Sequence, residues 1–340
     1  MAIHDRALSE RFPDGTGERR GERGRVRGAA RWKRRLKVYG VVLAFVPLGV
    51  IAGRITGCAE RLFYFPEREA DIRTPSGVED VLFESEGLTL HGWFMPAIAQ
   101  GLDADEGPDI DEAGRDAAAV TEHGDLVTPD EAGSLPTVVF CHGNAMHIER
   151  HEVFVAFLRR RGFNVFMFDY RGYGRSDAGP LRRDRLIADA VAAIDTVAAR
   201  ADVDPDRIGL MGMSLGGTIG LAAATERDRV RSVCSVVTFS AWPEVASDHA
   251  GWLGRFLIAR GRDAEDSVAL LGERPLLLVH GTEDRVVPYR HAPLIRDAAV
   301  AAGVETEFVT IDGANHVDWI ESGEARDAIS GFFERTLSPR

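Results

Sequence analysis

Residues 208–217 read IGLMGMSLGG, a short apolar run that ends in a turn of small residues around Ser214. The run Ile208–Met211 predicts a buried β-strand, and the residues after the turn have a helical pattern. A serine on a sharp turn between strand and helix is held exposed, and Gly212 and Gly216 allow the backbone to turn tightly. The N–H groups and positive potential of the helix start favour a developing negative oxygen. The stretch therefore predicts a nucleophilic serine at the end of a strand.

Outward from this turn, the chain alternates between short apolar runs and helical patterns. Continuous apolar runs are typical of parallel strands buried on both faces, and residues 184–198 place their apolar side chains on one helical face. This alternation predicts an α/β fold with a mostly parallel central sheet flanked by helices. The expected strands are an antiparallel pair at Val81–Phe83 and Leu88–Phe94, followed by Thr137–Phe140, Val165–Phe168, Ile208–Met211, Val233–Val237, Pro275–Val279 and Glu307–Ile311.

A nucleophilic serine needs a base, and the base needs an acid that orients it. Asp284 follows the expected strand Pro275–Val279, and His316 follows the last expected strand. The order Ser214, Asp284, His316 places all three side chains at the carboxyl ends of parallel strands. We therefore predict these three as the catalytic residues.

Other acids and bases in these segments fit the roles less well. His291 is close to Asp284 in sequence and belongs to the helix that should follow. Glu283 would point away from the site if its neighbour points into it. Asp312 and Asp318 are too near the predicted base in the chain to orient it easily.

Two backbone N–H groups are expected to form the oxyanion hole. One belongs to Leu215, directly after the serine, and the other to the loop 141–145, which reads CHGNA after the strand Thr137–Phe140. We assign the second donor to Asn144, with Ala145 as the alternative. His142 is expected to shape this loop rather than act as a second base.

The cysteine content excludes a disulfide scaffold, because the chain of 340 residues has only three cysteines. No CxxC pair suggests structural zinc. Cys141 and Cys234 lie on apolar strands and are expected to be inert core thiols. The predicted chemistry needs neither a metal nor an organic cofactor.

The chain carries a net charge of -12, yet residues 1–37 hold 12 Lys and Arg against 5 Asp and Glu. This basic tail is expected to be disordered, and the acidic remainder makes nucleic acid an unexpected partner of the folded part. Residues 38–59 are apolar apart from Arg54 and are long enough to cross a bilayer. They predict a transmembrane signal anchor with the N-terminus in the cytoplasm and the body on the opposite, extracytoplasmic side. A buried soluble helix and a lipid-bearing Cys58 are the alternatives.

Two later segments interrupt the strand–helix alternation. Residues 97–134 hold 11 Asp and Glu and one Arg without a sustained period, which predicts a disordered acidic insertion. The glycine spacing of a calcium-binding EF-hand is absent from it. Residues 241–268 mix tryptophan, phenylalanine and aliphatic residues with charges after a strand, which predicts a short cap over the strand ends.

Five motifs together resemble an α/β-hydrolase-fold serine hydrolase: His142–Asn144 (HGN), Asp169–Ser176 (DYRGYGRS), Gly212–Gly216 (GMSLG), His280–Pro288 (HGTEDRVVP) and His316. The N-terminal span, the lead-in Phe63–Pro66 (FYFP) and the short cap resemble a membrane-anchored branch of that superfamily. The resemblance covers residues 60–340 apart from the acidic insertion, which departs from the usual short strand connection. It implies that Asp169–Ser176 is a structural turn beside the active site.

Members of this superfamily cleave esters, thioesters or peptides, and a fold alone does not choose among these. The apolar cap favours a membrane-bound esterase or thioesterase acting on a small acyl substrate, with lipid-like esters included. A serine exopeptidase is the first alternative. A non-catalytic scaffold that binds a partner through the acidic insertion is the second.

Overall fold

A computed structural model describes residues 58–98 and 135–339. The described residues belong to one compact unit. The predicted basic tail (1–37), residues 38–57 of the predicted membrane anchor and residues 99–134 of the acidic insertion lie outside the described residues. The last two residues of the predicted anchor, Cys58 and Ala59, belong to a short 3-10 helix, η1 (Cys58–Phe63). Within the described ranges, no helix is both long enough and apolar enough to cross a membrane.

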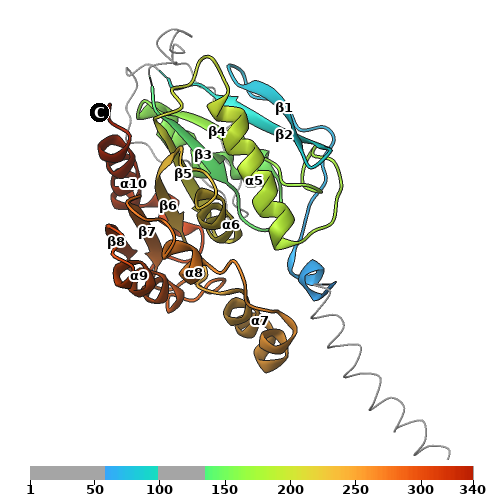
Figure 1. Ribbon diagram of the computed structural model, residues 1–340, viewed down its shortest axis with the longest axis vertical. Coiled ribbons are helices and arrows are strands. Elements are labelled where there is room, and N and C mark those ends of the chain that lie inside the picture. Colours follow the sequence, from blue (N-terminus) through green and yellow to red (C-terminus); the bar gives the residue numbers. More distant parts are fainter. Residues whose placement is uncertain (1–57, 99–134, 340) are drawn as a thin grey trace, which may run out of the picture. The chain divides into compact units, whose positions relative to one another are not determined.

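The described strands form one eight-stranded sheet in the order β1-β2-β4-β3-β5-β6-β7-β8 (Figure 1). The antiparallel strands β1 and β2 lie at one edge, β2 pairs antiparallel with β4, and all later neighbours are parallel. Every strand expected from the sequence is present, which confirms the mostly parallel sheet. The strands are β1 (Glu79–Ser85), β2 (Leu88–Met95), β3 (Thr137–Cys141), β4 (Asn164–Phe168), β5 (Ile208–Met213), β6 (Val230–Val236), β7 (Leu276–Gly281) and β8 (Thr306–Ile311).

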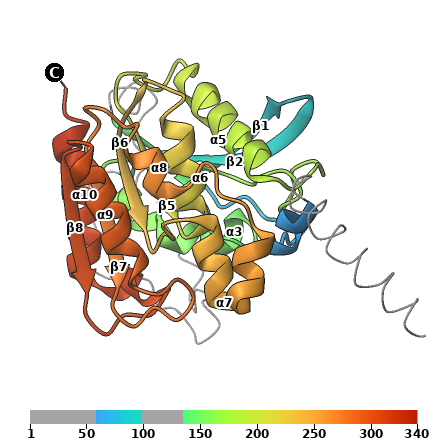
Figure 2. The same cartoon turned by 60° about the horizontal axis from the view of Figure 1, so that its bottom comes forward.

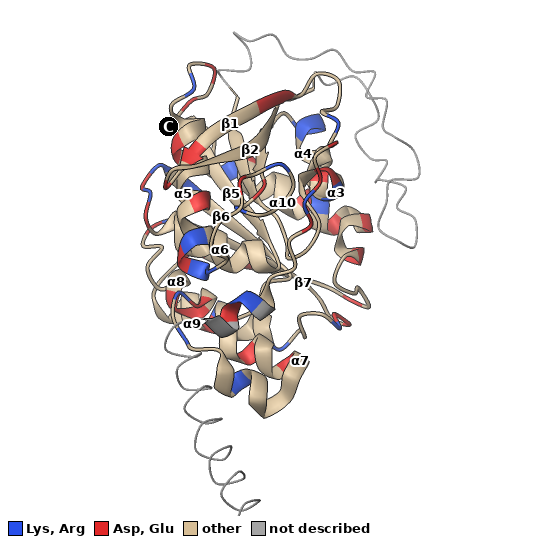
Figure 3. Ribbon diagram, turned by 90° about the vertical axis from the view of Figure 1, so that its right-hand side faces the viewer, with Lys and Arg blue, Asp and Glu red and all other residues tan. Residues whose placement is uncertain are grey.

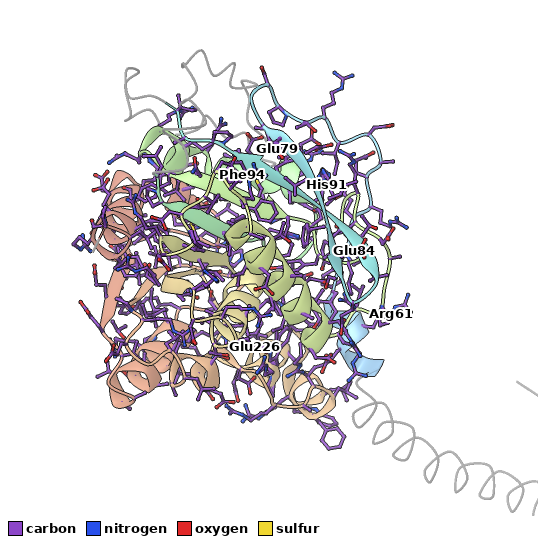
Figure 4. The ribbon with its side chains drawn as sticks, turned by 45° about the horizontal axis from the view of Figure 1, so that its top comes forward. Arg61, Glu79, Glu84, His91, Phe94 and Glu226 are labelled. Carbon is purple, nitrogen blue, oxygen red and sulfur yellow. The ribbon has the colours of Figure 1, made fainter. Side chains whose placement is uncertain are left out.

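Helices cover both faces of the sheet and create two separate apolar cores. Successive side chains of a strand point to opposite faces, so Val139 of β3 lies in one core and Val138 in the other. On β2, His91 and Phe94 likewise project from opposite faces (Figure 4). One core takes in α5 (Arg183–Ala198), α6 (Leu215–Ala224), α8 (Ala264–Val268) and α9 (His291–Ala301), and the other α3 (Ile148–His151), η2 (Glu152–Phe154), α4 (Ala156–Arg160), η3 (Asp318–Glu321) and α10 (Gly323–Thr336).

The segment predicted as a cap, residues 241–268, folds into α7 (Trp242–Leu257) and α8. The backbone of α7 is broken at Ala250 and Gly251, where Gly251 takes a positive φ of 59° that glycine adopts without strain. Figure 2 shows α7 as two short helical pieces beside η1. The break divides α7 into a first half that packs on the body and a second half that is largely exposed.

The predicted start of the acidic insertion is wrong by two residues. Ala97 and Ile98 are buried, and their backbone N–H groups donate to the Asn164 side-chain oxygen and the Arg159 carbonyl, both at 3.0 Å. Both residues are apolar and continue the chain path of β2, so they pack on the body. Composition alone grouped them with the acidic residues that follow.

Candidate active site

Ser214 lies between the end of β5 and the start of α6, where the sequence predicts the nucleophile. It is less exposed than predicted, because only 8% of the residue is accessible and it lines a cavity. Its backbone is in a strained region with φ 55° and ψ −117°. Hydrogen bonds hold this turn: the Ser214 N–H donates to the Val236 carbonyl at 2.9 Å, and the Gly217 N–H donates to the Ser214 carbonyl at 3.1 Å. Neighbouring strand β6 therefore stabilises a conformation that serine would not adopt alone.

The glycines around Ser214 are required by close packing. A Cβ atom on Gly216 would lie 1.9 Å from the Cys141 carbonyl oxygen, and one on Gly212 would lie 2.4 Å from the Gly216 carbonyl oxygen. The start of α6 therefore packs directly against the end of β3. This close packing brings Ser214 next to the loop that follows β3.

Asp284 and His316 are in direct contact, although 32 residues separate them. The His316 Nδ1 donates to the Asp284 Oδ2 at 2.7 Å, while the other carboxylate oxygen accepts from the N–H groups of Val286 and Val287, both at 2.8 Å. Burial alone would raise the pKa of Asp284. Hydrogen bonds from His280 and His316 outweigh it and hold this pKa well below its ordinary value. A carboxylate that stays ionised orients the imidazole and leaves its Nε2 as the basic nitrogen.

The three predicted catalytic residues follow the carboxyl ends of β5, β7 and β8. Among the described residues, no hydrogen bond joins the Ser214 hydroxyl to His316. Such bonds are often long without substrate and tighten when it binds. The geometry thus joins the acid to the base and places the serine on the same edge of the sheet.

The competing acids and bases are engaged elsewhere. His291 begins α9, and its Nε2 contacts the Asp248 carboxylate at 2.7 Å while its Nδ1 accepts the backbone N–H of Ser240 at 3.1 Å. Both ring nitrogens are therefore occupied. Glu283 is exposed, whereas Asp312 accepts from Thr282 and Asp318 accepts from the Asn315 N–H.

The two candidates for the second oxyanion donor differ in their hydrogen bonding. The Ala145 N–H donates to the Asn144 side-chain oxygen at 3.0 Å, so it is already engaged. In the described part of the chain, the backbone N–H groups of Asn144 and Leu215 donate to no protein acceptor. These two N–H groups are therefore available to a substrate oxygen. His142 contacts the Gly143 carbonyl at 2.8 Å and is fully buried, consistent with a role in shaping the loop.

The Asn144 side chain ties the oxyanion loop to the segment that follows η1. Its Oδ1 accepts from the Phe65 N–H and the Tyr173 hydroxyl, both at 3.0 Å. Its Nδ2 donates to the Phe63 carbonyl at 2.6 Å. The backbone of Asn144 is thus fixed by residues that are distant in sequence.

Replacing Asn144 by alanine is expected to lower kcat for an ester by about 10²-fold, the effect of losing one oxyanion donor. The backbone N–H remains, but the loop that aims it loses its connections to Phe63, Phe65 and Tyr173. Steady-state kinetics on a soluble ester check this. Tyr173→Phe, which removes only one of these contacts, should have a smaller effect, and an unchanged kcat in Asn144→Ala would contradict this role.

A cavity of about 510 Å³ opens directly at Ser214 and Leu215. Its wall includes the aromatic residues Phe63, Phe65 and Phe239. Residues of α7 and the pair Val286 and Val287 also contribute to it. The wall is almost entirely apolar, and its volume lies in the range of small-molecule sites. The α7 residues in the wall are Val245, Ala246, His249, Ala250, Gly254 and Leu257.

The sequence interpretation missed part of this wall. Phe63 and Phe65 belong to a motif noted only for its resemblance, and Val286 and Val287 lie in the loop that carries the predicted acid. Phe63 packs edge-on against Trp242 at 5.6 Å and Phe239 at 6.2 Å. Val286 and Val287 lie only two and three residues after Asp284. This short spacing in the sequence could have indicated that they lie next to the site.

Among the described residues, no group of three His, Cys, Asp or Glu side chains is arranged to hold a metal ion. Cys141 and Cys234 are free and fully buried. Burial raises the pKa of the Cys141 thiol to about 12 and raises that of Cys234 as well. Both thiols are therefore un-ionised at neutral pH and unreactive.

Comparison with known proteins agrees with the topology described above. A family model described as the alpha/beta hydrolase fold matches residues 136–265. The chain is 31% identical to the uncharacterized protein YfhR of Salmonella typhi, over 82% of this chain and 89% of the relative. It is 30% identical to the alpha/beta hydrolase domain-containing protein WAV2 of Arabidopsis thaliana, over 72% of this chain and 75% of the relative.

Among solved structures, the Pyrococcus furiosus esterase Pf2001 superposes with a TM-score of 0.60 at 18% identity. The match covers 81% of this chain and 98% of that chain, which indicates a shared fold. Together with the strand order and the turn that carries Ser214, these similarities show that the chain belongs to the α/β-hydrolase-fold family.

Proposed function

We propose that this protein is a membrane-anchored serine hydrolase that cleaves carboxylic ester or thioester bonds of small acyl compounds through Ser214, His316 and Asp284. The observation that carries the proposal is the apolar cavity that opens at Ser214. Such a wall favours an apolar acyl group and places its carbonyl carbon at the serine hydroxyl. The similarity in fold to an esterase is consistent with this reaction.

In the proposed mechanism, the Ser214 hydroxyl attacks the acyl carbon while His316 takes its proton. Asp284 holds the imidazole in the tautomer that leaves Nε2 free and stabilises the imidazolium that forms. The N–H groups of Asn144 and Leu215 stabilise the tetrahedral oxyanion. His316 then gives the proton to the leaving alcohol or thiol, and water hydrolyses the acyl-enzyme by the same steps. The scheme needs no metal or organic cofactor.

The composition of the wall favours this function over an exopeptidase. An exopeptidase that recognises a free amino terminus needs a negative group near the cleft to pair with the ammonium. None of the described residues that line the cavity is an aspartate or a glutamate. His249 is the only Lys, Arg, His, Asp or Glu residue among those lining residues.

Esters of graded acyl length provide the test of this proposal. The purified full chain should hydrolyse p-nitrophenyl esters, with kcat/KM rising as the acyl chain lengthens until the cavity is filled, because each buried methylene adds binding energy. A fluorophosphonate should label the wild type and leave Ser214→Ala unlabelled. Labelling that persists in Ser214→Ala, or no hydrolysis of any ester, would contradict the proposal. The latter result would favour the binding scaffold.

We further propose that residues 38–59 anchor the protein, with the basic tail in the cytoplasm and the hydrolase domain on the opposite side. The basic residues before the apolar segment support this orientation. A reporter that is active only in the cytoplasm should be silent when it is fused after Arg340. The same reporter should be active when it is fused to the basic tail, on the N-terminal side of residue 38. A strong signal from the C-terminal fusion would show that the orientation is wrong.

A further inference from the structure

The second half of α7 exposes three large apolar side chains, which we call the α7 apolar face. Trp252 is 79% exposed, Leu253 45% and Phe256 44%. The three side chains lie on the half of α7 that follows the break at Gly251, and none of them lines the cavity, whereas Gly254 and Leu257 of the same half do. Exposed apolar clusters of this kind mark surfaces that bind another protein or a membrane.

The α7 apolar face borders the mouth of the cavity. Residues that both line the cavity and reach solvent mark its opening, and these include Phe65, Val286, His249 and Ala250. Ala250 is followed directly by Gly251 and Trp252. The apolar rim of the cavity therefore continues into the exposed face of the helix.

The point where the described chain begins indicates what covers this surface. Residues 38–57 are apolar apart from Arg54, and they end immediately before η1. Six residues of 3-10 helix span only about 12 Å. At the other end of η1, Phe63 packs against Trp242, the first residue of α7. Figures 1 and 2 both show η1 next to α7. A bilayer that holds residues 38–57 is therefore within reach of α7.

The charges around this face favour an apolar partner over an anionic one. Residues 249–262 contain no Asp or Glu, and most of α7 is uncharged in Figure 3. The three arginines of this stretch are each paired with a glutamate, so they offer little net positive charge. The pairs are Arg255 with Glu244, Arg260 with Glu265, and Arg262 with Glu226, which is labelled in Figure 4.

We propose that the α7 apolar face inserts into the boundary between headgroups and acyl chains of a lipid bilayer, so that the cavity mouth opens at the lipid surface. Tryptophan favours this boundary, where an apolar ring and a polar N–H are both accommodated. The inference rests on the proposed function and specifies its substrate class as acyl esters that partition into membranes. Because the arginines of residues 249–262 are paired with glutamates, zwitterionic lipid suffices and salt has little effect.

Fluorescence quenching by brominated lipid measures the insertion directly. The full chain is reconstituted in phosphatidylcholine vesicles with and without dibrominated phosphatidylcholine, and Trp252→Phe provides the background from the other tryptophans. Three of these, Trp93, Trp242 and Trp319, are buried. The emission of Trp252 is the difference between the wild type and Trp252→Phe. This emission should be strongly quenched by the brominated lipid, at low and at high salt alike. If this emission is not quenched, the face does not enter lipid, and crosslinking between copies through this surface would then assign it to a dimer. Either result overturns the proposal.

Activity on two substrates separates docking from catalysis. The triple variant Trp252→Ser, Leu253→Ser, Phe256→Ser should hydrolyse a long-chain ester embedded in vesicles at least about tenfold more slowly, because it buries less apolar area in lipid. Its turnover of a soluble short-chain ester should be unchanged. Leu82→Ser is the control, because Leu82 is also exposed but lies on β1, at the opposite end of the body from α7 in Figures 1 and 3.

Equal loss on both substrates, or no loss on either, would overturn the docking proposal. Failure of the proposed function gives a different result: the wild type would hydrolyse neither ester, while lipid quenching of Trp252 would persist. The two proposals therefore fail in distinguishable ways. The anchor is present in every variant, so a difference between variants reports on the α7 apolar face alone.

Discussion

Replacing Ser214 by alanine is expected to lower kcat for a soluble ester by about 10⁶-fold, as in triads whose members act as a unit. The remaining rate reflects binding and the oxyanion N–H groups alone. His316→Ala should fall to a similar rate, and the double variant should fall no further, because neither residue functions without the other. Asp284→Asn is expected to lose about 10⁴-fold, since the imidazole loses the carboxylate that selects its tautomer. Burst and steady-state kinetics of p-nitrophenyl ester hydrolysis measure these changes.

A buried serine outside the site serves as the matched control for these variants. Ser330 lies on α10, and its hydroxyl donates to the Arg326 carbonyl at 2.8 Å. Ser330→Ala should retain wild-type kcat and show only a small loss of stability. If Ser214→Ala hydrolysed the ester at the wild-type rate, the assignment of the nucleophile would be wrong. A double variant much slower than either single variant would show that the residues do not act as a unit.

The second large effect is expected on stability, at the buried ion pair between Arg171 and Asp189. Arg171 belongs to the turn Asp169–Ser176, and its guanidinium and backbone N–H donate to the fully buried Asp189 carboxylate of α5 at 2.6–3.1 Å. Asp189→Ala leaves the buried guanidinium without this partner, and only the partly exposed Glu86 remains as a carboxylate partner. The free energy of unfolding should fall by about 3–5 kcal/mol, because an unpaired buried charge is costly. Urea denaturation followed by circular dichroism measures the change.

The same helix supplies a control for this prediction. Asp195 of α5 forms an exposed ion pair with Arg227. Asp195→Ala should therefore lower the free energy of unfolding by less than about 1 kcal/mol, the usual value for a surface pair. The double variant Asp189→Ala, Arg171→Met should recover part of the loss, since it removes the orphaned charge. Equal effects of Asp189→Ala and Asp195→Ala would contradict the distinction.

This ion pair also clarifies the role of the turn Asp169–Ser176. The resemblance implies a structural turn, and the described contacts are consistent with that interpretation. Arg171 connects the turn to α5, while the Tyr173 hydroxyl donates to Asn144 in the oxyanion loop. The turn therefore helps to hold the loop that carries Asn144 in place.

The sequence by itself determined the sheet, because each strand is encoded locally. A continuous apolar run with flanking turns specifies a strand buried on both faces, whatever its partners. All eight expected runs became strands, and the segment 184–198 became α5. The turn at Ser214 could also be predicted, because the close packing of α6 against β5 and β3 requires glycine at Gly212 and Gly216, and the sequence shows both glycines. The main error in the local prediction concerned the start of the acidic insertion. Ala97 and Ile98 were assigned to it because composition does not distinguish them from the residues that follow.

Only the tertiary structure decided how distant segments meet at the site. The sequence left Asn144 and Ala145 as alternative oxyanion donors; the contact that engages the Ala145 N–H comes from an Asn144 side chain held by Phe63, Phe65 and Tyr173. The cavity wall likewise combines residues from η1 and the chain after it, α7 and the loop after β7. The exposure of the α7 apolar face, on the half of α7 after the backbone break at Ala250 and Gly251, likewise became known only from the structure. Local patterns specify each element, whereas these contacts join residues far apart in the chain, and their pairing is determined by how the elements pack around the sheet.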